Sequence, residues 1–337
     1  MDFGANQATL ARLHRDLEVA DHRELLDRLH VDVVDLRGVV DPVYRGPVPQ
    51  LSFLPDGTRR NFWGMQTRTM QTLTGPEECY CDFALSCCQT VEDFERHPWP
   101  SADWFDFTEF SDRLKPWEDR AILASGASIF QHPTFLRGLE NLLADMVSEP
   151  EMAHWLIGKF ASFYLAYFDR MLAAAGGRID IFRIADDLGM QDRLLISPEL
   201  FATFFSPHLR SLADMAHSHG AKVMFHSCGS ILPLVDPLIA LGIDILDPIQ
   251  VSAADMDPTV LKARFGSRIC LHGGIDTQHL LPHGTPEEVA ENVRRMMTIL
   301  GAGGGYILCP THVLQTDVPT ANILALYDTG QEYGSMA

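Results

Sequence analysis

The sequence predicts one α/β domain, a (β/α)8 barrel of the TIM type spanning residues 1–337. Three observations predict this fold. Short runs of β-branched and aromatic residues alternate with amphipathic helical stretches over roughly 200 residues, which is typical of parallel strands joined by right-handed crossovers. No glycine-rich phosphate turn follows an early strand, which disfavours an open doubly wound sheet. No linker rich in proline, glycine or serine divides the chain, and a barrel of this length commonly forms one domain.

Eight segments have the length and composition of barrel strands. They consist mainly of aliphatic and aromatic residues, as expected of strands that are covered on both faces. Because a closed barrel contains eight such strands, this number favours closure. The expected strands are Val31–Leu36, Arg60–Met65, Ala121–Ser125, Ile179–Ala185, Lys222–His226, Ile243–Asp247, Ile269–His272 and Tyr306–Cys309.

Helical stretches fill the intervals between these strands. Two of them have clear start signals, since Ser197 precedes Pro198 and Thr285 precedes Pro286. The expected helices are Thr134–Met146, Glu149–Ala175, Ser197–His219, Ile231–Leu241, Pro258–Phe265 and Pro286–Leu300. Residues from about 66 to 118 follow neither period, and we expect an irregular insertion near the barrel mouth rather than a separate domain.

Charge and hydropathy exclude several classes of partner. The chain has 26 Lys+Arg against 45 Asp+Glu, a net charge of −19, and an acidic surface repels phosphate backbones, so no nucleic acid is expected. No apolar run reaches the ~18 residues of a membrane span, and the charged N-terminal segment lacks the apolar core of a signal peptide. With seven cysteines and no export signal, we expect a cytoplasmic protein with reduced thiols and no membrane partner.

Functional side chains gather where the later strands end. In a barrel the carboxyl ends of the strands and the loops that follow them form the active face. Five successive expected strands each deliver an acid, a thiol, an imidazole or an amide to this face, whereas purely structural strand ends would carry turn residues. The candidates are Asp186, Asp187, His226, Cys228, Gln250, His272, Asp276, Cys309 and His312.

The pattern His226-x-Cys228 predicts a zinc site. Side chains alternate along an extended backbone, so these two point to the same side. Zinc is bound by histidine nitrogen and cysteine sulfur, and a catalytic zinc has three protein ligands and one open position. Cys309, at another strand end, is the expected third ligand. The alternative, a core histidine beside an inert thiol, stays open.

A second thiol cluster competes with this site. Cys79, Cys81, Cys87 and Cys88 lie within ten residues and could hold a structural zinc ion, although their spacing is not the usual one and their neighbours are apolar. Packing is the favoured interpretation of this cluster.

The remaining candidates have roles suggested by their chemistry. Asp186 and Asp187 are candidate catalytic acids; since they alternate in direction, we expect one to face the mouth and the other to cap a helix or pair with Arg183. His312 could donate a proton. The candidates for substrate binding are Gln250, His272 and Asp276.

Several segments resemble a known family. FHSCGSILPLVDPLIALGIDILDPIQ, GGIDTQHLLPHGTPEEV and GGGYILCPTHVLQTDVPTANILALYD are similar to sequences of the uroporphyrinogen decarboxylase superfamily, and the resemblance extends from about residue 30 to residue 330. It implies a distorted (β/α)8 barrel with the active site at the carboxyl-terminal mouth, and it makes a homodimer a possible assembly.

The resemblance points to one branch of this superfamily. The decarboxylases carry an arginine-rich N-terminal segment, which LRGVVDPVYRGPVPQ lacks. The zinc-dependent methyltransferase branch carries His-x-Cys…Cys, which falls here on His226, Cys228 and Cys309, with Asp186, Asp187 or substrate as the fourth ligand. The resemblance implies Zn²⁺, a small methylated substrate and a cobalt corrinoid (cobalamin) carried by a partner protein.

The expected reaction is O-demethylation, with a methoxylated aromatic as the first candidate substrate. The aromatic residues of Trp99–Phe110 and the Phe62–Trp63 pair could line its pocket. Three alternatives stay open: methyl transfer from methylcobalamin to a thiol, a metal-free decarboxylase that acts on a different small acid, and a corrinoid-binding relative without catalysis.

Overall fold

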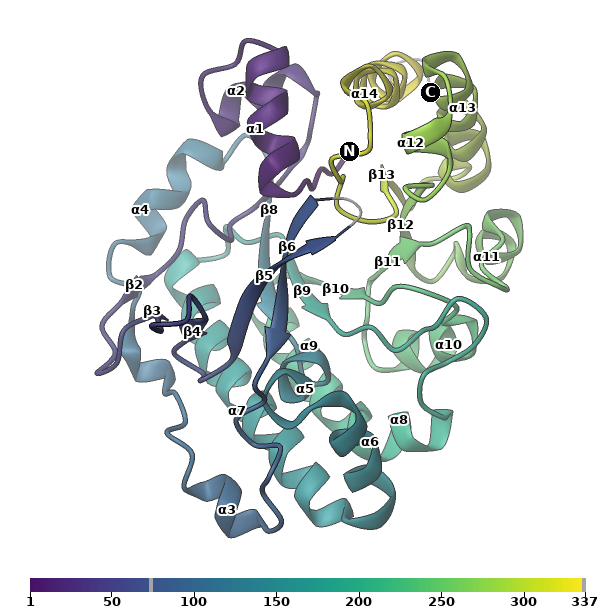
Figure 1. The fold of residues 1–337 in the computed structure, drawn as a ribbon. Helices are drawn as coiled ribbons and strands as arrows, with labels where there is room; N and C mark the ends of the chain where they lie inside the picture. The colour runs from purple at the N-terminus through teal and green to yellow at the C-terminus, as the bar shows by residue number, and fades with distance from the viewer. Residues whose placement is uncertain (73–74, 335–337) are drawn as a thin grey trace.

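The computed structural model describes residues 1–72 and 75–334. Within them, a sheet of seven parallel strands has the order β1-β8-β9-β10-β11-β12-β13, and helices surround it (Figure 1). The α/β barrel that the sequence predicts is therefore confirmed. The strands are β1 (Val33–Asp35), β8 (Ala121–Ala127), β9 (Ile181–Ala185), β10 (Lys222–His226), β11 (Ile245–Ile249), β12 (Cys270–Ile275) and β13 (Tyr306–Pro310).

The first residues of the chain fill the gap between the two edge strands. The amide of Asp2 donates to the carbonyl of Leu308 on β13 at 3.1 Å, and the amide of Asp32, next to β1, donates to the carbonyl of Met1 at 2.9 Å. Figure 1 places the N-terminus beside β13. The N-terminal segment thus takes the eighth position, and it brings the side chain of Asp2 into the barrel mouth.

The prediction of a barrel strand at Arg60–Met65 was wrong. Part of this segment forms β4 (Arg59–Asn61), which pairs antiparallel in a separate sheet of order β3-β4-β5-β6. The physical reason is composition, because Arg59, Arg60 and Asn61 cannot be covered on both faces of a parallel sheet. The other strands of this sheet are β3 (Leu51–Phe53), β5 (Gln66–Thr72) and β6 (Gly75–Cys81), and the β5–β6 hairpin lies across the front of the barrel in Figure 1.

Helices form the outer layer, and two expected helices are divided. The Thr134–Met146 stretch is interrupted at Gly138, where φ is +87°, and the Ser197–His219 stretch is interrupted at Phe205. The helices after β8 are α5 (Gln131–Arg137), α6 (Leu139–Ser148), α7 (Pro150–Ala175), α8 (Pro198–Phe204), α9 (Ser206–Ser218), α10 (Leu232–Ala240), α11 (Pro258–Phe265), α12 (Leu280–His283), α13 (Pro286–Gly301) and α14 (Thr320–Gly334). Among the described residues, no helix is long and apolar enough to span a membrane.

Part of the segment before β8 packs against α7. It contains α1 (Gln7–Asp16), α2 (His22–Arg28), β2 (Val43–Tyr44), α3 (Val91–Glu95), β7 (Phe105–Asp106) and α4 (Phe110–Leu114). Trp63 stacks on Phe160 of α7 with ring centroids 4.4 Å apart, and Phe105 contacts Tyr167. Most of the aromatic residues that we expected to line a substrate pocket thus belong to the core or pack against it, and none of them lines the cavity described below.

Candidate metal and active site

A cavity of about 560 Å³ opens at the carboxyl ends of the barrel strands. Each of the strands β9 to β13 contributes a polar side chain at or next to its end, as the sequence predicts for the active face of a barrel. The polar residues that line the cavity include Asp2, Asp35, Arg37, Ser125, Gln131, His132, Arg183, Asp187, His226, Asp247, His272, Cys309 and His312.

One group of possible metal ligands lies at the end of β10. Nε2 of His226 is 3.6 Å from Sγ of Cys228 and 3.7 Å from Oδ1 of Asp187, and the three ligand atoms lie within 4.8 Å of one another. Ligands of a tetrahedral zinc ion with bonds of 2.0–2.3 Å are separated by roughly 3.3–3.8 Å. The donor types and their spacing therefore fit zinc.

Hydrogen bonds hold Asp187 in this group. Its Oδ1 accepts the backbone amide of Cys228 at 2.9 Å, and its Oδ2 accepts the side-chain amide of Gln131 at 2.6 Å. The first of these bonds joins the carboxylate to the loop that carries the thiol. Asp187 and Cys228 are consequently positioned together, without need for rearrangement when an ion binds.

Asp247 on β11 orients the histidine. Its Oδ2 lies 2.8 Å from Nδ1 of His226 and 2.7 Å from Nη2 of Arg183. A metal-binding histidine usually gives its second N–H to a carboxylate, which fixes the tautomer and leaves the other nitrogen free for the ion. Burial would raise the pKa of Asp247, but Arg183 and the histidines hold it well below its usual range, so this residue is a carboxylate at neutral pH.

The two thiols of the mouth are poor anions without a cation. Burial raises the pKa of Cys228 far above its usual range, with Asp187 and Asp247 adding to the effect. Burial also raises the pKa of Cys309 to about 11. A bound metal ion reverses this situation, because a coordinating thiol is deprotonated outright. The raised pKa values thus argue against either thiol as a free nucleophile and agree with metal binding or with packing.

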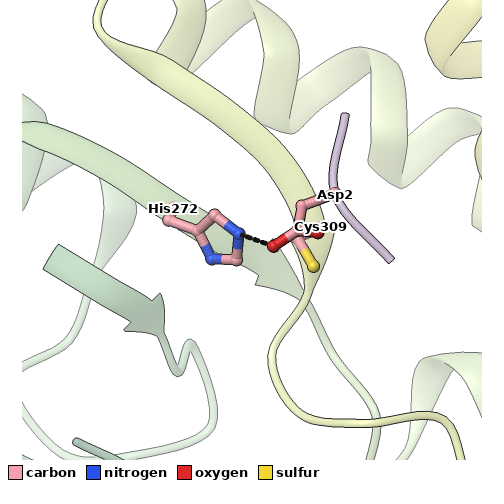
Figure 2. A group of neighbouring side chains, drawn as sticks. All are labelled: Asp2, His272 and Cys309. Carbon is pink, nitrogen blue, oxygen red and sulfur yellow. Dashed lines mark hydrogen bonds and ion pairs between the residues drawn. The ribbon is translucent and has the colours of Figure 1, made fainter. Parts of the chain in front are cut away.

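A second group lies on the other side of Asp247. Asp2, His272 and Cys309 offer three ligand atoms within 4.8 Å of one another (Figure 2), and Nε2 of His272 is 3.0 Å from Oδ2 of Asp2. The structure thus groups Cys309 with His272 rather than with His226 and Cys228. Among the described residues, the expected set of His226, Cys228 and Cys309 does not form one group within this limit.

A family model described as uroporphyrinogen decarboxylase (URO-D) matches residues 118–333, nearly two thirds of the chain. The chain belongs to the uroporphyrinogen decarboxylase family. This match covers β8 to β13 and the nine candidate residues at the strand ends. Asp2 and the N-terminal segment lie outside it.

Relatives within this family differ in their named activities. A uroporphyrinogen decarboxylase from Pseudoalteromonas atlantica is 23% identical over 194 residues, 56% of this chain and 50% of the relative. A methylated-thiol–coenzyme M methyltransferase from Methanosarcina mazei is 29% identical over 160 residues, 47% of this chain and 40% of the relative. The chain thus matches about half the length of these curated relatives.

The fold agrees with that of a solved structure. A methyltransferase from Methanosarcina mazei superposes with a TM-score of 0.62 and 15% identity, over 99% of this chain and 92% of the other. At this identity the likeness concerns the fold, and it supports the barrel architecture over nearly the full length.

Asp186 lies in a different environment from the adjacent Asp187. It is 1% exposed, does not line the cavity, and accepts four hydrogen bonds, from the Ser128 hydroxyl and from the amides of Ile129, Phe130 and Gln131. Burial raises its pKa to about 6, against the lowering effect of these donors. Asp186 therefore holds the loop that precedes α5, which agrees with the capping alternative and not with the predicted catalytic role.

Two of the expected substrate-binding residues, Gln250 and Asp276, hydrogen-bond to backbone amides instead. Oε1 of Gln250 accepts the amide of Gly229 at 2.6 Å, which positions the loop after Cys228. Asp276 accepts the amides of Gln278 and His279 in the turn after β12. Neither residue lines the cavity, so direct contact with a substrate there is not supported. His272 does line it, but as the partner of Asp2 and Asp247.

His312 stands at the opening of the cavity. Its Nδ1 is 3.3 Å from the carbonyl of Val313, and desolvation together with the nearby His226 lowers its pKa. A neutral imidazole at this place suits proton transfer to or from a ligand in the cavity. The catalytic role of His312 stays a prediction.

Three residues of the site were not singled out from the sequence. Asp247 was visible at a strand end, where an acid that precedes a proline in an apolar strand is a usable signal. Arg183 was considered only as a partner of the neighbouring acids. Asp2 could not be found, because its place depends on hydrogen bonds to residues about 300 positions away.

The second thiol cluster does not form a metal site among the described residues. Cys79 and Cys81 are opposite Arg68 and Gln66 in the β5–β6 hairpin, whereas Cys88 lies in the loop whose carbonyl accepts from Arg137. Burial and Asp93 raise the pKa of Cys88, so this thiol is neutral. This arrangement agrees with the packing interpretation.

His132, which lines the cavity, is expected to make the stability of the fold sensitive to acid. Burial, with a contribution from Arg37, lowers the pKa of His132 to about 4, and its Nδ1 contacts the hydroxyl of Tyr164. A group with a depressed pKa contributes stability that is present above its unfolded pKa of about 6.5 and is lost as the pH falls towards the folded value. His132→Asn keeps a polar atom for Tyr164 but does not titrate.

Because His132 takes up a proton more readily in the unfolded chain, we expect the unfolding free energy of the parent to fall by about 2 kcal/mol from pH 7 to pH 5. The His132→Asn variant should not show this decrease. Urea titrations at both pH values measure the difference. His283→Asn, the same replacement at an exposed histidine outside the cavity, is the control for the substitution itself. Equal losses in parent and His132→Asn protein would contradict the assignment.

Proposed function

We propose that this protein is a zinc-dependent methyltransferase that moves a methyl group from a small methylated substrate to a cobalt corrinoid carried by a partner protein. The observation that carries the proposal is the group of His226, Cys228 and Asp187, in which Nε2 of His226 lies 3.6 Å from Sγ of Cys228 and 3.7 Å from Oδ1 of Asp187. His226 and Asp187 also line the cavity of about 560 Å³. The name of the methyltransferase relative from Methanosarcina mazei supports the same reaction class.

In this proposal the zinc ion is held by His226 and Cys228, with Asp187 as third ligand. Asp187 was expected as one candidate for a further position, and its contacts to His226 and Cys228 support it here. Cys309, the third ligand that the sequence pattern favours, lies in the neighbouring group. Zinc binding by Cys309 together with His226 stays a prediction that the experiments below test.

A zinc ion at this place would act as a Lewis acid on the heteroatom from which the methyl group departs. The protein residues do the remaining work. Nδ1 of His226 lies 2.8 Å from Asp247 and 2.7 Å from Nη2 of Arg183, and donation from Nδ1 to Asp247 would leave Nε2 free for the ion. His312, at the cavity opening, is placed to transfer a proton to the demethylated product.

The charge of the cavity argues against a polycarboxylate substrate. Two arginines line it, and Arg183 is paired with Asp247 at 2.7 Å. The remaining Arg37 has a side chain that is 67% exposed and stands 3.9 Å from Asp35. A decarboxylase for a polycarboxylate would need several unpaired cations here, so metal-free decarboxylation is the less supported alternative.

The methyl donor is tested directly. Purified protein, zinc, reduced corrinoid protein and each of four donor classes are incubated, and the corrinoid absorption spectrum reports methylation. The donors are a methoxylated aromatic, a methylated thiol, methylamine and methanol. We expect one class to methylate the corrinoid; none of the four doing so, with zinc present, would reject the proposal.

Transfer involving a thiol is the second candidate. It is favoured by the methylated-thiol–coenzyme M methyltransferase among the relatives, whereas the aromatic wall that suggested a methoxyarene is packed against α7. In this direction the same zinc site would hold a thiol as thiolate, the form in which sulfur is nucleophilic. Consumption of methylcobalamin by an added thiol separates this candidate from the first.

A further inference from the structure

We infer that Asp2, His272 and Cys309 form a second divalent-cation site, separate from the zinc site proposed at His226. The inference concerns the same cavity and goes beyond the proposed function, which needs one zinc ion. It rests on the geometry around Asp247 and on the donor chemistry of the three residues.

The two groups repeat the same arrangement about one carboxylate. Oδ2 of Asp247 lies 2.8 Å from Nδ1 of His226, and Oδ1 lies 2.8 Å from Nδ1 of His272. The far nitrogen of each histidine then faces one cysteine and one aspartate: Cys228 and Asp187 for His226, Cys309 and Asp2 for His272. Asp247 thus lies next to Nδ1 of both imidazoles, and its contact with His226 has the geometry of a hydrogen bond, whereas its contact with His272 is an ion-pair distance only.

The strand order explains how one carboxylate reaches both rings. β11, which carries Asp247, lies between β10 with His226 and β12 with His272. His226 is in direct register with Asp247. Figure 2 shows the second group built from three chain segments, with Asp2 on the N-terminal segment beside the strand of Cys309.

The donor set selects a class of ion. Carboxylate oxygen, imidazole nitrogen and thiolate sulfur together suit zinc, cobalt or ferrous iron, whereas magnesium and calcium prefer oxygen donors alone. A thiolate and a carboxylate carry two negative charges, which one divalent ion neutralises. The ion can enter, because all three residues line the cavity.

The hydrogen bonding of His272 leaves room for this role. The residue is 3% exposed, and its Nδ1, although near Asp247, has no partner of hydrogen-bond geometry. Its Nε2 lies 3.0 Å from Oδ2 of Asp2. A cation that inserts between Nε2, the Asp2 carboxylate and Sγ of Cys309 would replace this single contact by three coordinate bonds.

Metal counting tests the inference without reference to catalysis. Protein without an N-terminal tag, since Asp2 lies in the site, is reconstituted with zinc under reducing conditions, desalted and analysed by plasma mass spectrometry. We expect about two zinc ions per chain in the parent and about one in each of the His272→Asn and His226→Asn variants. Cys270→Ala, on the same strand as His272 but outside both groups, is the matched control and should keep about two.

Cobalt(II) provides a spectroscopic readout for the second site alone. In the His226→Asn background, bound cobalt should show thiolate-to-cobalt charge-transfer absorption that Cys309→Ala abolishes and Cys270→Ala preserves. If a variant fails to fold, anomalous diffraction from a crystal of the parent protein, recorded at the zinc absorption edge, locates the bound ions instead. Two anomalous peaks, on either side of Asp247, are expected.

Other outcomes overturn the second site. About one zinc ion per chain that His272→Asn retains would leave Asp2 and His272 as a buried ion pair only. About one zinc ion that both Cys228→Ala and Cys309→Ala lose would mean that the two thiols share a single ion. Two ions without methyl transfer would instead reject the proposed function and keep this inference.

Discussion

The Cys228→Ala variant is expected to lose its zinc ion at the His226 site and at least about a thousandfold in methyl-transfer rate. Cys228 supplies the one sulfur ligand of that group, and its removal leaves an imidazole and a carboxylate. A Lewis acid contributes several kcal/mol to the stabilisation of the leaving group, and each 1.36 kcal/mol corresponds to a factor of ten in rate. Initial rates of corrinoid methylation, measured beside metal content, give both quantities.

The control for this variant is Cys270→Ala. Cys270 is the first residue of β12 and packs against a small apolar cluster that includes Val33, Leu123 and Ile181. Its replacement should leave the rate within about twofold of the parent. If Cys228→Ala were as active as the parent while free of zinc, metal-dependent transfer would be rejected and metal-free chemistry would become the working account.

The Asp186→Ala variant is expected to be destabilised by about 3–5 kcal/mol. The carboxylate accepts four hydrogen bonds at 2.6–3.0 Å from Ser128, Ile129, Phe130 and Gln131, and it is 1% exposed. Its removal leaves these donors buried without an acceptor, which costs more than the net contribution of the bonds themselves. Urea denaturation at neutral pH measures the change in apparent unfolding free energy.

Asp192→Ala is the matched comparison, since Asp192 lies on the same loop with a side chain that is 64% exposed. We expect its stability within about 0.5 kcal/mol of the parent. Asp186→Asn, which keeps one acceptor oxygen, should fall between the two. A loss below about 1 kcal/mol in Asp186→Ala would show that the loop before α5 does not depend on this carboxylate.

The later half of the barrel was predictable because its strands and helices obey simple periods. Lys222–His226 and Pro258–Phe265 have the expected bounds, and Thr285 forms the capping box that its sequence indicates. The prediction of a strand at Arg60–Met65 was wrong because polar residues precede the short aromatic run: Arg59–Asn61 pair in an antiparallel sheet, and Phe62 and Trp63 lie in the turn that follows. The eighth barrel position is taken by residues at the N-terminus, whose sequence has no strand pattern.

The sequence predicted the types of residue in the site better than it predicted which of them lie together. Spacing alone placed His226 and Cys228 together, and alternation correctly separated the directions of Asp186 and Asp187. No local pattern could assign Cys309 to His272, because that contact depends on the curvature of the sheet and on the N-terminal segment. Gln250 and Asp276 illustrate the same limit: a polar residue at a strand end can serve a backbone turn as readily as a ligand.

The most direct test of the central claim is the zinc content of the purified parent protein compared with that of a Cys228→Ala, Asp187→Ala double variant. The account predicts that the parent binds zinc at the His226 site and that the double variant loses about one equivalent there while it stays folded. A parent protein that contains no zinc after reduction and reconstitution, or a double variant that retains the full content, would contradict the account.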